Sequence, residues 1–272
     1  MVLNFLTLFK YSWKTSSYFV SSRRLYSSQF SKYDSISDRY KIHILPALSD
    51  NYMYLLTDKF LKFGIAVDPV EPEKIMKTLA MEELELRAVI TTHHHYDHAG
   101  GNKLISEMKK NLTIYGGDER IEALTNKISH NEILKIGDIV IRCLHTPCHT
   151  SGHVCYFIDC ETIPEPICFT GDTLFIGGCG RFFEGSANDM LQSLDILSAL
   201  PLSTKIYCGH EYSLNNLKYA LSIEPDNEEA LNKFKEIQEK LKKSEPSVPS
   251  KLAISHATLL PGVKMLSPVT FG

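Results

Sequence analysis

The sequence predicts a layered fold that mixes strands and helices, of the α/β or α+β class, and three observations support this prediction. Short apolar runs rich in β-branched residues gather in two groups, with helical patterns between and after them. A length of 272 residues suits one large domain, alone or with a small second one. Hydrophobic residues at 43% and charged residues at 22% are ordinary for a globular protein. These observations predict the class but not the order of the strands.

The N-terminal segment differs from the rest of the chain. Residues 1–33 contain no Asp or Glu, and basic residues are scattered among serines. Such a composition is typical of a mitochondrial transit peptide, which we expect at residues 1–26 with cleavage after Tyr26. The expected location is therefore the mitochondrial matrix, and a disordered leader on a cytoplasmic protein is the alternative.

The globular pattern begins near residue 40, and its first half contains strands and helices in turn. Ser49 and Asp50 form a turn between two strands, Pro72 lies in the first turn of a helix, and the apolar run 87–91 predicts a buried strand. The expected strands are residues 41–47, 51–57, 63–67, 87–91 and 112–115, and the expected helices are residues 71–83 and 102–110.

The second half contains another group of strands and ends in helices. In the last helix an apolar stripe recurs at helical spacing and is expected to face the core; it consists of Leu231, Phe234, Ile237 and Leu241. The expected strands are residues 139–145, 154–159, 167–170 and 205–208, and the expected helices are residues 188–200, 215–221 and 226–243.

Composition argues against several classes of partner. The net charge of −3 argues against nucleic acid, because phosphate binding needs a basic excess. No segment after the N-terminal one has the ~20 apolar residues of a transmembrane helix, so we expect no membrane partner. The seven cysteines, between Cys143 and Cys208, form no Cys-x-x-Cys pair, which predicts reduced and mostly buried thiols.

The most informative segment follows the predicted strand 87–91. His93, His95, Asp97 and His98 lie within six residues of one another. Imidazole and carboxylate groups this close together are costly to bury unpaired, whereas divalent metals bind them well. In a loop, alternate residues can turn to one side, so His93 and His95 would face one metal and Asp97 and His98 another.

Three later residues are further candidates, because each comes just after a predicted strand. They are His149, Asp172 and His210. Loops at one end of a sheet are where a rigid scaffold commonly carries a metal site.

The order His-x-His-x-Asp-His, followed by separate His, Asp and His positions, resembles the metallo-β-lactamase superfamily over residues 41–245. This resemblance implies an αββα sandwich as the catalytic domain at residues 40–212, followed by a C-terminal helical region at residues 213–272 that is short and atypical. It implies that one metal is held by His93, His95 and His149, a second by Asp97, His98 and His210, and that Asp172 bridges them.

Neighbouring residues in these motifs are expected outside the ligand set. His94, His145 and His153 are interpreted as packing residues or as residues that orient a ligand. Cys148 occupies a position where the family commonly has Gly. If that turn needs a positive φ, a cysteine costs on the order of 1 kcal/mol and could shift His149.

Two divalent ions about 3.5–4 Å apart can hold a hydroxide between them and lower the pKa of water from about 15.7 towards 7. The residues expected to take part in catalysis are Asp172, as the bridge, and Asp97, as a ligand and hydrogen-bond partner of the hydroxide. Zinc, iron and manganese all suit nitrogen and oxygen ligands, and zinc is the expected metal.

A second segment narrows the substrate class. Gly-Gly-Cys-Gly-Arg-Phe-Phe-Glu-Gly at residues 177–185 resembles the corresponding loop of the glyoxalase II family, as do residues 209–212 and 245–250. The resemblance implies a monomeric hydrolase that cleaves S-D-lactoylglutathione to D-lactate and glutathione in methylglyoxal detoxification. Glutathione carries two carboxylates, so Arg181 is expected to bind one of them, while Phe183 and Tyr212 line the peptide.

The C-terminal residues 251–272 depart from this family, because its basic residues for glutathione carboxylates find no clear counterpart here. We therefore expect an intact metal site with weakened glutathione binding, each lost contact costing about 1.5–3 kcal/mol. One alternative is a persulfide dioxygenase of the same superfamily, with one iron held by His93, His149 and Asp172. Another is a weakly active or non-catalytic isoform.

Overall fold

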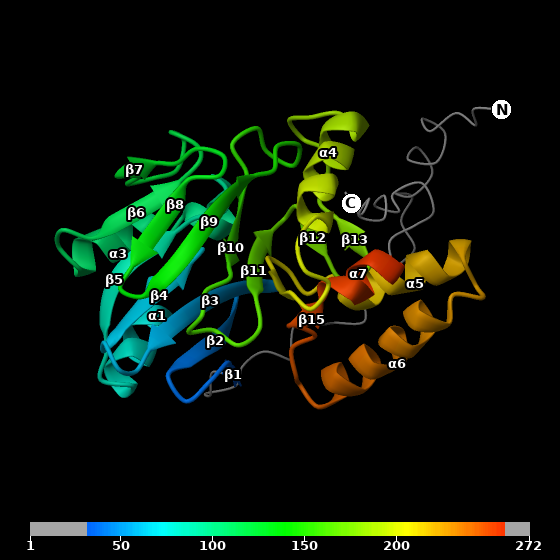
Figure 1. The fold of residues 1–272 in the computed structure, drawn as a ribbon, viewed down its shortest axis with the longest axis horizontal. Helices are drawn as coiled ribbons and strands as arrows, with labels where there is room; N and C mark the ends of the chain where they lie inside the picture. The colour runs from blue at the N-terminus through cyan, green and yellow to red at the C-terminus, as the bar shows by residue number, and fades with distance from the viewer. Residues whose placement is uncertain (1–31, 259–272) are drawn as a thin grey trace.

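The computed structural model of the chain describes residues 32–258. The predicted transit peptide, residues 1–26, and residues 259–272 of the divergent tail lie outside this part. Two mixed β-sheets stacked face to face form the centre of the molecule (Figure 1).

The first sheet has seven strands in chain order, β1-β2-β3-β4-β5-β6-β7. Its first four strands are antiparallel, and β4 to β7 run parallel. The strands are β1 (Lys32–Ser35), β2 (Tyr40–Ala47), β3 (Asn51–Asp58), β4 (Phe63–Val67), β5 (Glu85–Ile90), β6 (Thr113–Gly116) and β7 (Asn126–Lys127).

The second sheet has six strands in the order β15-β14-β11-β10-β9-β8, and only β11 and β14 pair in parallel. A two-stranded hairpin, β12 (Leu174–Phe175) and β13 (Gly178–Cys179), follows β11. The strands of the larger sheet are β8 (Ile133–Ile136), β9 (Ile139–His145), β10 (Val154–Ile158), β11 (Ile167–Gly171), β14 (Lys205–Cys208) and β15 (Ser250–Lys251).

The alternation of side chains along each strand builds the layers. Tyr54 of β3 points into the cluster between the sheets, where it meets Phe169 of β11. Leu55, the next residue, points to the opposite face and packs in one cluster with Ile75 and Leu79.

Helices cover the outer faces of both sheets. The first sheet is covered by α1 (Pro72–Met81) and α3 (Asn102–Met108), and the second by α4 (Ala187–Ser198). Ser186 caps α4 in a capping box with Asp189, a feature that contributes on the order of 1 kcal/mol. The αββα sandwich implied by the resemblance is therefore confirmed.

Three helices make up the C-terminal region: α5 (Ser213–Ile223), α6 (Glu228–Lys242) and α7 (Leu252–Thr258). In α6, Ile237 is buried while Phe234 and Leu241 are partly buried against the core, as predicted. The prediction for Leu231 was wrong, since it is 37% exposed and Ala230 is buried in its place. The buried stripe begins one residue earlier than predicted. Among the described residues, no helix is long and apolar enough to cross a membrane.

Candidate metal centre

Segments that follow strands of both sheets meet at one edge of the sandwich and carry the candidate ligands; Asp97 and His98 lie on the short helix α2 (Tyr96–Ala99) rather than in the expected loop. They follow β5, β9, β11 and β14. Backbone hydrogen bonds join these loops across the two sheets, from Val154 N–H to the Thr92 carbonyl (2.9 Å) and from Tyr52 N–H to the Gly209 carbonyl (2.8 Å). The site is therefore built on the ends of rigid strands.

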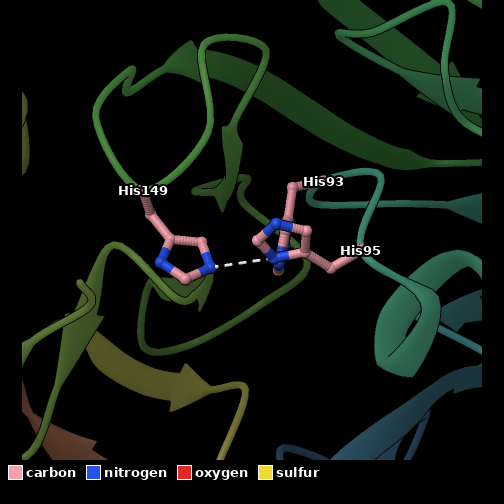
Figure 2. A group of neighbouring side chains, drawn as sticks. All are labelled: His93, His95 and His149. Atoms are coloured by element: carbon pink, nitrogen blue, oxygen red, sulfur yellow. Dashed lines mark hydrogen bonds between the residues drawn. The ribbon is translucent and has the colours of Figure 1, made fainter. Parts of the chain in front are cut away.

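Three imidazoles from two of these loops converge on one point (Figure 2). The Nδ1 atom of His95 lies 3.0 Å from Nε2 of His93 and 3.1 Å from Nε2 of His149. Burial lowers the pKa of all three histidines, most strongly for His93, which is fully buried. Neutral rings that turn nitrogen atoms toward a common point are suited to a cation.

The hydrogen bonds behind two of these rings determine which nitrogen faces the site. The Thr92 hydroxyl donates its only proton to Asp68 (2.7 Å), so it can only accept from Nδ1–H of His93 at 3.1 Å. Nδ1–H of His149 donates to the backbone carbonyl of Arg181 at 3.0 Å. Nε2 of both rings is therefore free of a proton and faces the site.

A second group lies beside the first and consists of Asp97, His98 and His210. Nε2 of His98 is 3.2 Å from Nε2 of His210, and Oδ2 of Asp97 is 3.3 Å from the latter atom. Nδ1–H of His98 donates to Asp68 (2.9 Å), and Nδ1–H of His210 donates to Asp50 (2.8 Å). Here too an acceptor behind each ring binds Nδ1–H, which orients the ring so that Nε2 faces the site.

Asp172 reaches both groups. Its carboxylate oxygens lie 3.4 Å from Nε2 of His98, 3.4 Å from Nε2 of His210 and 3.5 Å from Nε2 of His149. Its Oδ1 is buried and has no hydrogen-bond partner among the described residues. A Cβ at Gly209 would lie 2.3 Å from this oxygen, so only glycine leaves room for it. A buried carboxylate oxygen without a donor is expected where a metal binds.

The two carboxylates of the site are anionic at neutral pH. Burial alone would raise the pKa of Asp172, but His98, His210 and His149 lower it below its ordinary value. The pKa of Asp97 is likewise lowered despite its burial, by His210, His98 and Asn51. The negative charge at the centre of the site therefore favours a cation.

All seven predicted metal ligands meet in this site. Their ligand atoms form three groups, in each of which the atoms lie within 4.8 Å of one another. Five imidazoles and two carboxylates in this arrangement would suit two divalent metal ions, and Asp172 is near ligands of both groups. The groups are His93, His95 and His149; His93, His98 and Asp172; and Asp97, His98 and His210.

The three predicted substrate-binding residues border the same site. The ring of Phe183 lies 5.2 Å from that of His149 and is 59% exposed. The ring of Tyr212 stacks on His210 with centroids 4.6 Å apart. Arg181 is exposed on the loop that also carries Phe183. Two aromatic rings thus lie against ligand histidines, and the backbone of Arg181 borders His149.

Sequence reasoning missed two carboxylates that orient ligands, Asp68 and Asp50, although it allowed that one of His94, His145 and His153 orients a ligand. Asp68 directly follows the predicted strand 63–67, in the same kind of position as the predicted ligands, and that signal could have identified it. Asp50 was interpreted only as a turn residue, and nothing in its local sequence points to His210. Among the neighbouring histidines, His153 accepts a hydrogen bond from the Asp172 backbone at 3.1 Å.

Cys148 packs beneath the site rather than lining it. Its side chain is fully buried, and its Sγ donates to the Ser186 carbonyl at 3.3 Å. Its φ of 158° is close to the extended value that any residue can adopt, so the structure does not require the predicted strain. His149 keeps its place in the site beside it.

Two family models match consecutive parts of the chain. Residues 62–210 match the metallo-beta-lactamase superfamily, and residues 211–258 match the hydroxyacylglutathione hydrolase C-terminus. The second match continues past residue 250, the point after which we expected the chain to diverge. Together the two matches span both groups of candidate ligands and the C-terminal helices.

Curated relatives are similar over most of their length. A hydroxyacylglutathione hydrolase from Dictyostelium discoideum is 47% identical over 211 residues, which cover 75% of this chain and 79% of that protein. A cytoplasmic hydroxyacylglutathione hydrolase from Arabidopsis thaliana is 43% identical, with coverage of 78% and 83%. Among solved structures, ETHE1 from Myxococcus xanthus is 29% identical with a TM-score of 0.57, covering 63% of this chain and 76% of that one.

Proposed function

Because the chain belongs to the metallo-β-lactamase superfamily and to its hydroxyacylglutathione hydrolase family, we propose that it hydrolyses S-D-lactoylglutathione to glutathione and D-lactate. Other 2-hydroxyacylglutathiones would be cleaved in the same way. The observation that carries this proposal is the position of Asp172, whose carboxylate reaches a ring nitrogen of both ligand groups. In a metal-dependent hydrolase with this arrangement, the Asp172 carboxylate would be available to hold both ions.

When bound, two divalent ions, which we propose to be zinc, would supply an activated water at neutral pH and a Lewis acid for the thioester carbonyl. His93, His95 and His149 would hold one ion, Asp97, His98 and His210 the other, and Asp172 both. The chain's own contribution is to hold these ligands in place and to exclude bulk water, since most of the donor atoms are buried.

Asp97 is the ligand best placed to act on the attacking water. Its Oδ2 accepts a hydrogen bond from the Asn51 amide at 2.9 Å. The carboxylate would accept a hydrogen bond from the water and so orient it. The carboxylate is ionised at neutral pH, because its pKa is lowered despite its burial. The thiolate of glutathione can leave without a general acid, since the pKa of a thiol is about 8.5.

The aromatic and cationic groups at the entrance suit a glutathione thioester. Arg181 would bind a glycyl or glutamyl carboxylate, and the exposed faces of Phe183 and Tyr212 would contact the peptide. Since both rings contact ligand histidines, a peptide held between them places its thioester beside the metal centre. In this proposal the substrate is a small molecule, and neither nucleic acid nor membrane takes part.

The persulfide dioxygenase is the less favoured alternative. It would use one iron and only His93, His149 and Asp172. The second group would then bind no metal, although hydrogen bonds orient its histidines in the same way as those of the first group. The match of residues 211–258 to the hydrolase C-terminal model also favours thioester hydrolysis.

The test is to supply the purified full chain with S-D-lactoylglutathione and, separately, with glutathione persulfide. Hydrolysis is followed as loss of thioester absorbance with release of D-lactate and free thiol, and dioxygenase activity as oxygen uptake. We expect hydrolysis and no oxygen uptake. A raised KM would support the expected weakening of glutathione binding, while oxygen uptake without hydrolysis would replace this proposal with the alternative.

A further inference from the structure

The two halves of the candidate metal centre are backed by groups of different charge. In the first half the groups behind two of the three rings are neutral, namely the Thr92 hydroxyl behind His93 and the Arg181 backbone carbonyl behind His149. A neutral acceptor fixes the orientation of a ring but adds no net charge near the cation.

In the second half the backing groups are carboxylates. Asp50 accepts from Nδ1–H of His210 at 2.8 Å, and Asp68 accepts from Nδ1–H of His98 at 2.9 Å. Asp68 reaches the first half only through the Thr92 hydroxyl. The second half also has a carboxylate among its own ligands, Asp97, which no member of the first trio matches.

The turn that carries Asp50 is fastened to the loop that carries His210. The backbone carbonyl of Asp50 accepts a hydrogen bond from Glu211 N–H at 2.8 Å, and Tyr52 N–H donates to the Gly209 carbonyl at 2.8 Å. The next residue, Asn51, donates to Oδ2 of Asp97 at 2.9 Å. The same short segment therefore positions two of the three ligands of the second half before any ion arrives.

The backing carboxylates and the prearranged ligands both increase the metal affinity of the second half. A carboxylate behind an imidazole increases the electron density on its coordinating nitrogen, and ligands that are already in place need no ordering on binding. The Asp68 side chain is only 4% exposed, so its charge is poorly screened, whereas that of Asp50 is 38% exposed and acts mainly by holding the His210 ring in place.

We propose that Asp97, His98 and His210 form the tighter of the two metal subsites, and that Asp50 is the positioning residue that makes it so. This inference rests on the dinuclear centre of the proposed function. It predicts an order of loading, with the subsite of Asp97, His98 and His210 filled first and emptied last.

The experiment equilibrates the zinc-loaded full chain with a series of zinc–chelator buffers and measures bound metal per chain. For the wild type we expect release in two steps. His149→Ala removes a ligand of the first subsite and His210→Ala one of the second, so the ion left in His149→Ala should be held more tightly than the ion left in His210→Ala. Asp50→Asn should weaken the tighter step by about 10–100-fold and leave the weaker step unchanged.

Asp34→Asn is the matched control. Asp34 is a carboxylate that accepts from the Tyr207 hydroxyl at 2.6 Å, away from the candidate centre, and its substitution should change neither step. If thermal unfolding shows that Asp50→Asn does not fold, the comparison of His149→Ala with His210→Ala decides alone.

Three results would overturn the inference. The first is release of both zinc ions in one step, and the second is tighter binding of the remaining zinc ion in His210→Ala than in His149→Ala. The third is an effect of a folded Asp50→Asn on the weaker release step. If the wild type binds no zinc, iron or manganese at all, the dinuclear proposal itself fails. That outcome is distinct from binding in the wrong order.

Discussion

The backbone N–H of Asp172 donates a 3.1 Å hydrogen bond to Nε2 of His153. Nε2 can accept only if it carries no proton, so the ring proton is on Nδ1, where the hydroxyls of Thr146 (3.1 Å) and Thr173 (3.0 Å) lie. Burial lowers the pKa of His153 well below its ordinary value, which keeps the ring neutral. His153 thus holds the backbone of the residue that reaches both halves of the metal centre.

Substitution of His153 should separate its role as an acceptor from its role as filler. Glutamine can place its amide oxygen near the position of Nε2, whereas asparagine reaches only that of Nδ1. We expect His153→Gln to keep its metal, and His153→Asn to lose about 1–3 kcal/mol of stability, from the unsatisfied N–H, and about 10–100-fold in metal affinity. Chelator competition and thermal unfolding measure both quantities. Equal metal affinity in the two variants would show that His153 only fills space.

Arg120 joins the loop after β6 to the loop that carries Arg181 and Phe183. Its guanidinium donates to both carboxylate oxygens of Glu184, at 2.6 and 2.8 Å, and to Asp118. Arg120 and the Ser151 backbone N–H lower the pKa of Glu184 below its ordinary value of 4.5. Because the pKa is depressed in the folded state, the stability from this pair is fully present above that value and is lost as the pH falls below it.

We therefore expect Glu184→Gln to lower the Tm at pH 7 by about 1–3 °C, a modest effect because the pair is partly exposed to solvent. The gap from the wild type should narrow as the pH falls below about 4.5, because the unfolded wild-type chain then binds a proton on Glu184 that the folded chain binds only at lower pH. Glu107→Gln, at an exposed carboxylate on α3, is the control. A gap that stays constant from pH 7 to about 3 would mean that charge on Glu184 contributes nothing.

The cysteines near the site are not expected to act as nucleophiles. Burial raises the pKa of the Cys148 thiol to about 11 and that of Cys179 to about 12, so neither is a thiolate at neutral pH. Cys148→Ala should retain two metals and change kcat by no more than about threefold, because its backbone, not its thiol, borders His149. Loss of kcat by about 100-fold with metals intact would assign the thiol a role in the reaction.

Arg181 offers a test of how the substrate is recognised. Its backbone carbonyl accepts from Nδ1–H of His149, so a substitution of its side chain leaves that hydrogen-bond acceptor in place. Loss of one charge-assisted contact of about 1.5–3 kcal/mol predicts a KM about 10–100-fold higher in Arg181→Gln, with kcat little changed. The control is an acyl thioester of N-acetylcysteamine, which lacks the glutathione carboxylates. An equal rise in KM for both thioesters would contradict a contact between Arg181 and a carboxylate.

Strand and helix positions were predictable wherever the local pattern of apolar residues matches the residues that are buried in the fold. The expected strands 63–67, 139–145 and 205–208 coincide with β4, β9 and β14, because each is an apolar run ended by a turn or a polar loop. Strand β15, which was not predicted, has two residues and exists only through pairing with β14, about 45 residues earlier in the chain. Such pairing has no local signal.

The metal ligands were predictable for a different reason. Six residues of the His93–His98 segment concentrate donor atoms at a spacing that suits few other purposes, and the later ligands follow strands. The residues behind them were not predictable in the same way. The contact of Asp50 with His210 joins positions 160 residues apart, and that of Arg120 with Glu184 joins positions 64 apart. The sequence around a lone Asp or Arg in a loop does not indicate a partner so far away in the chain.

The measurement that tests the account most directly is hydrolysis of S-D-lactoylglutathione during stepwise return of zinc to chelator-treated protein, with bound metal determined on the same samples. The account predicts no activity without metal, and activity that rises until two ions are bound per chain and then stays level. Activity in the metal-free protein, or full activity with a single ion, would contradict the bridging role of Asp172 and with it the dinuclear hydrolase.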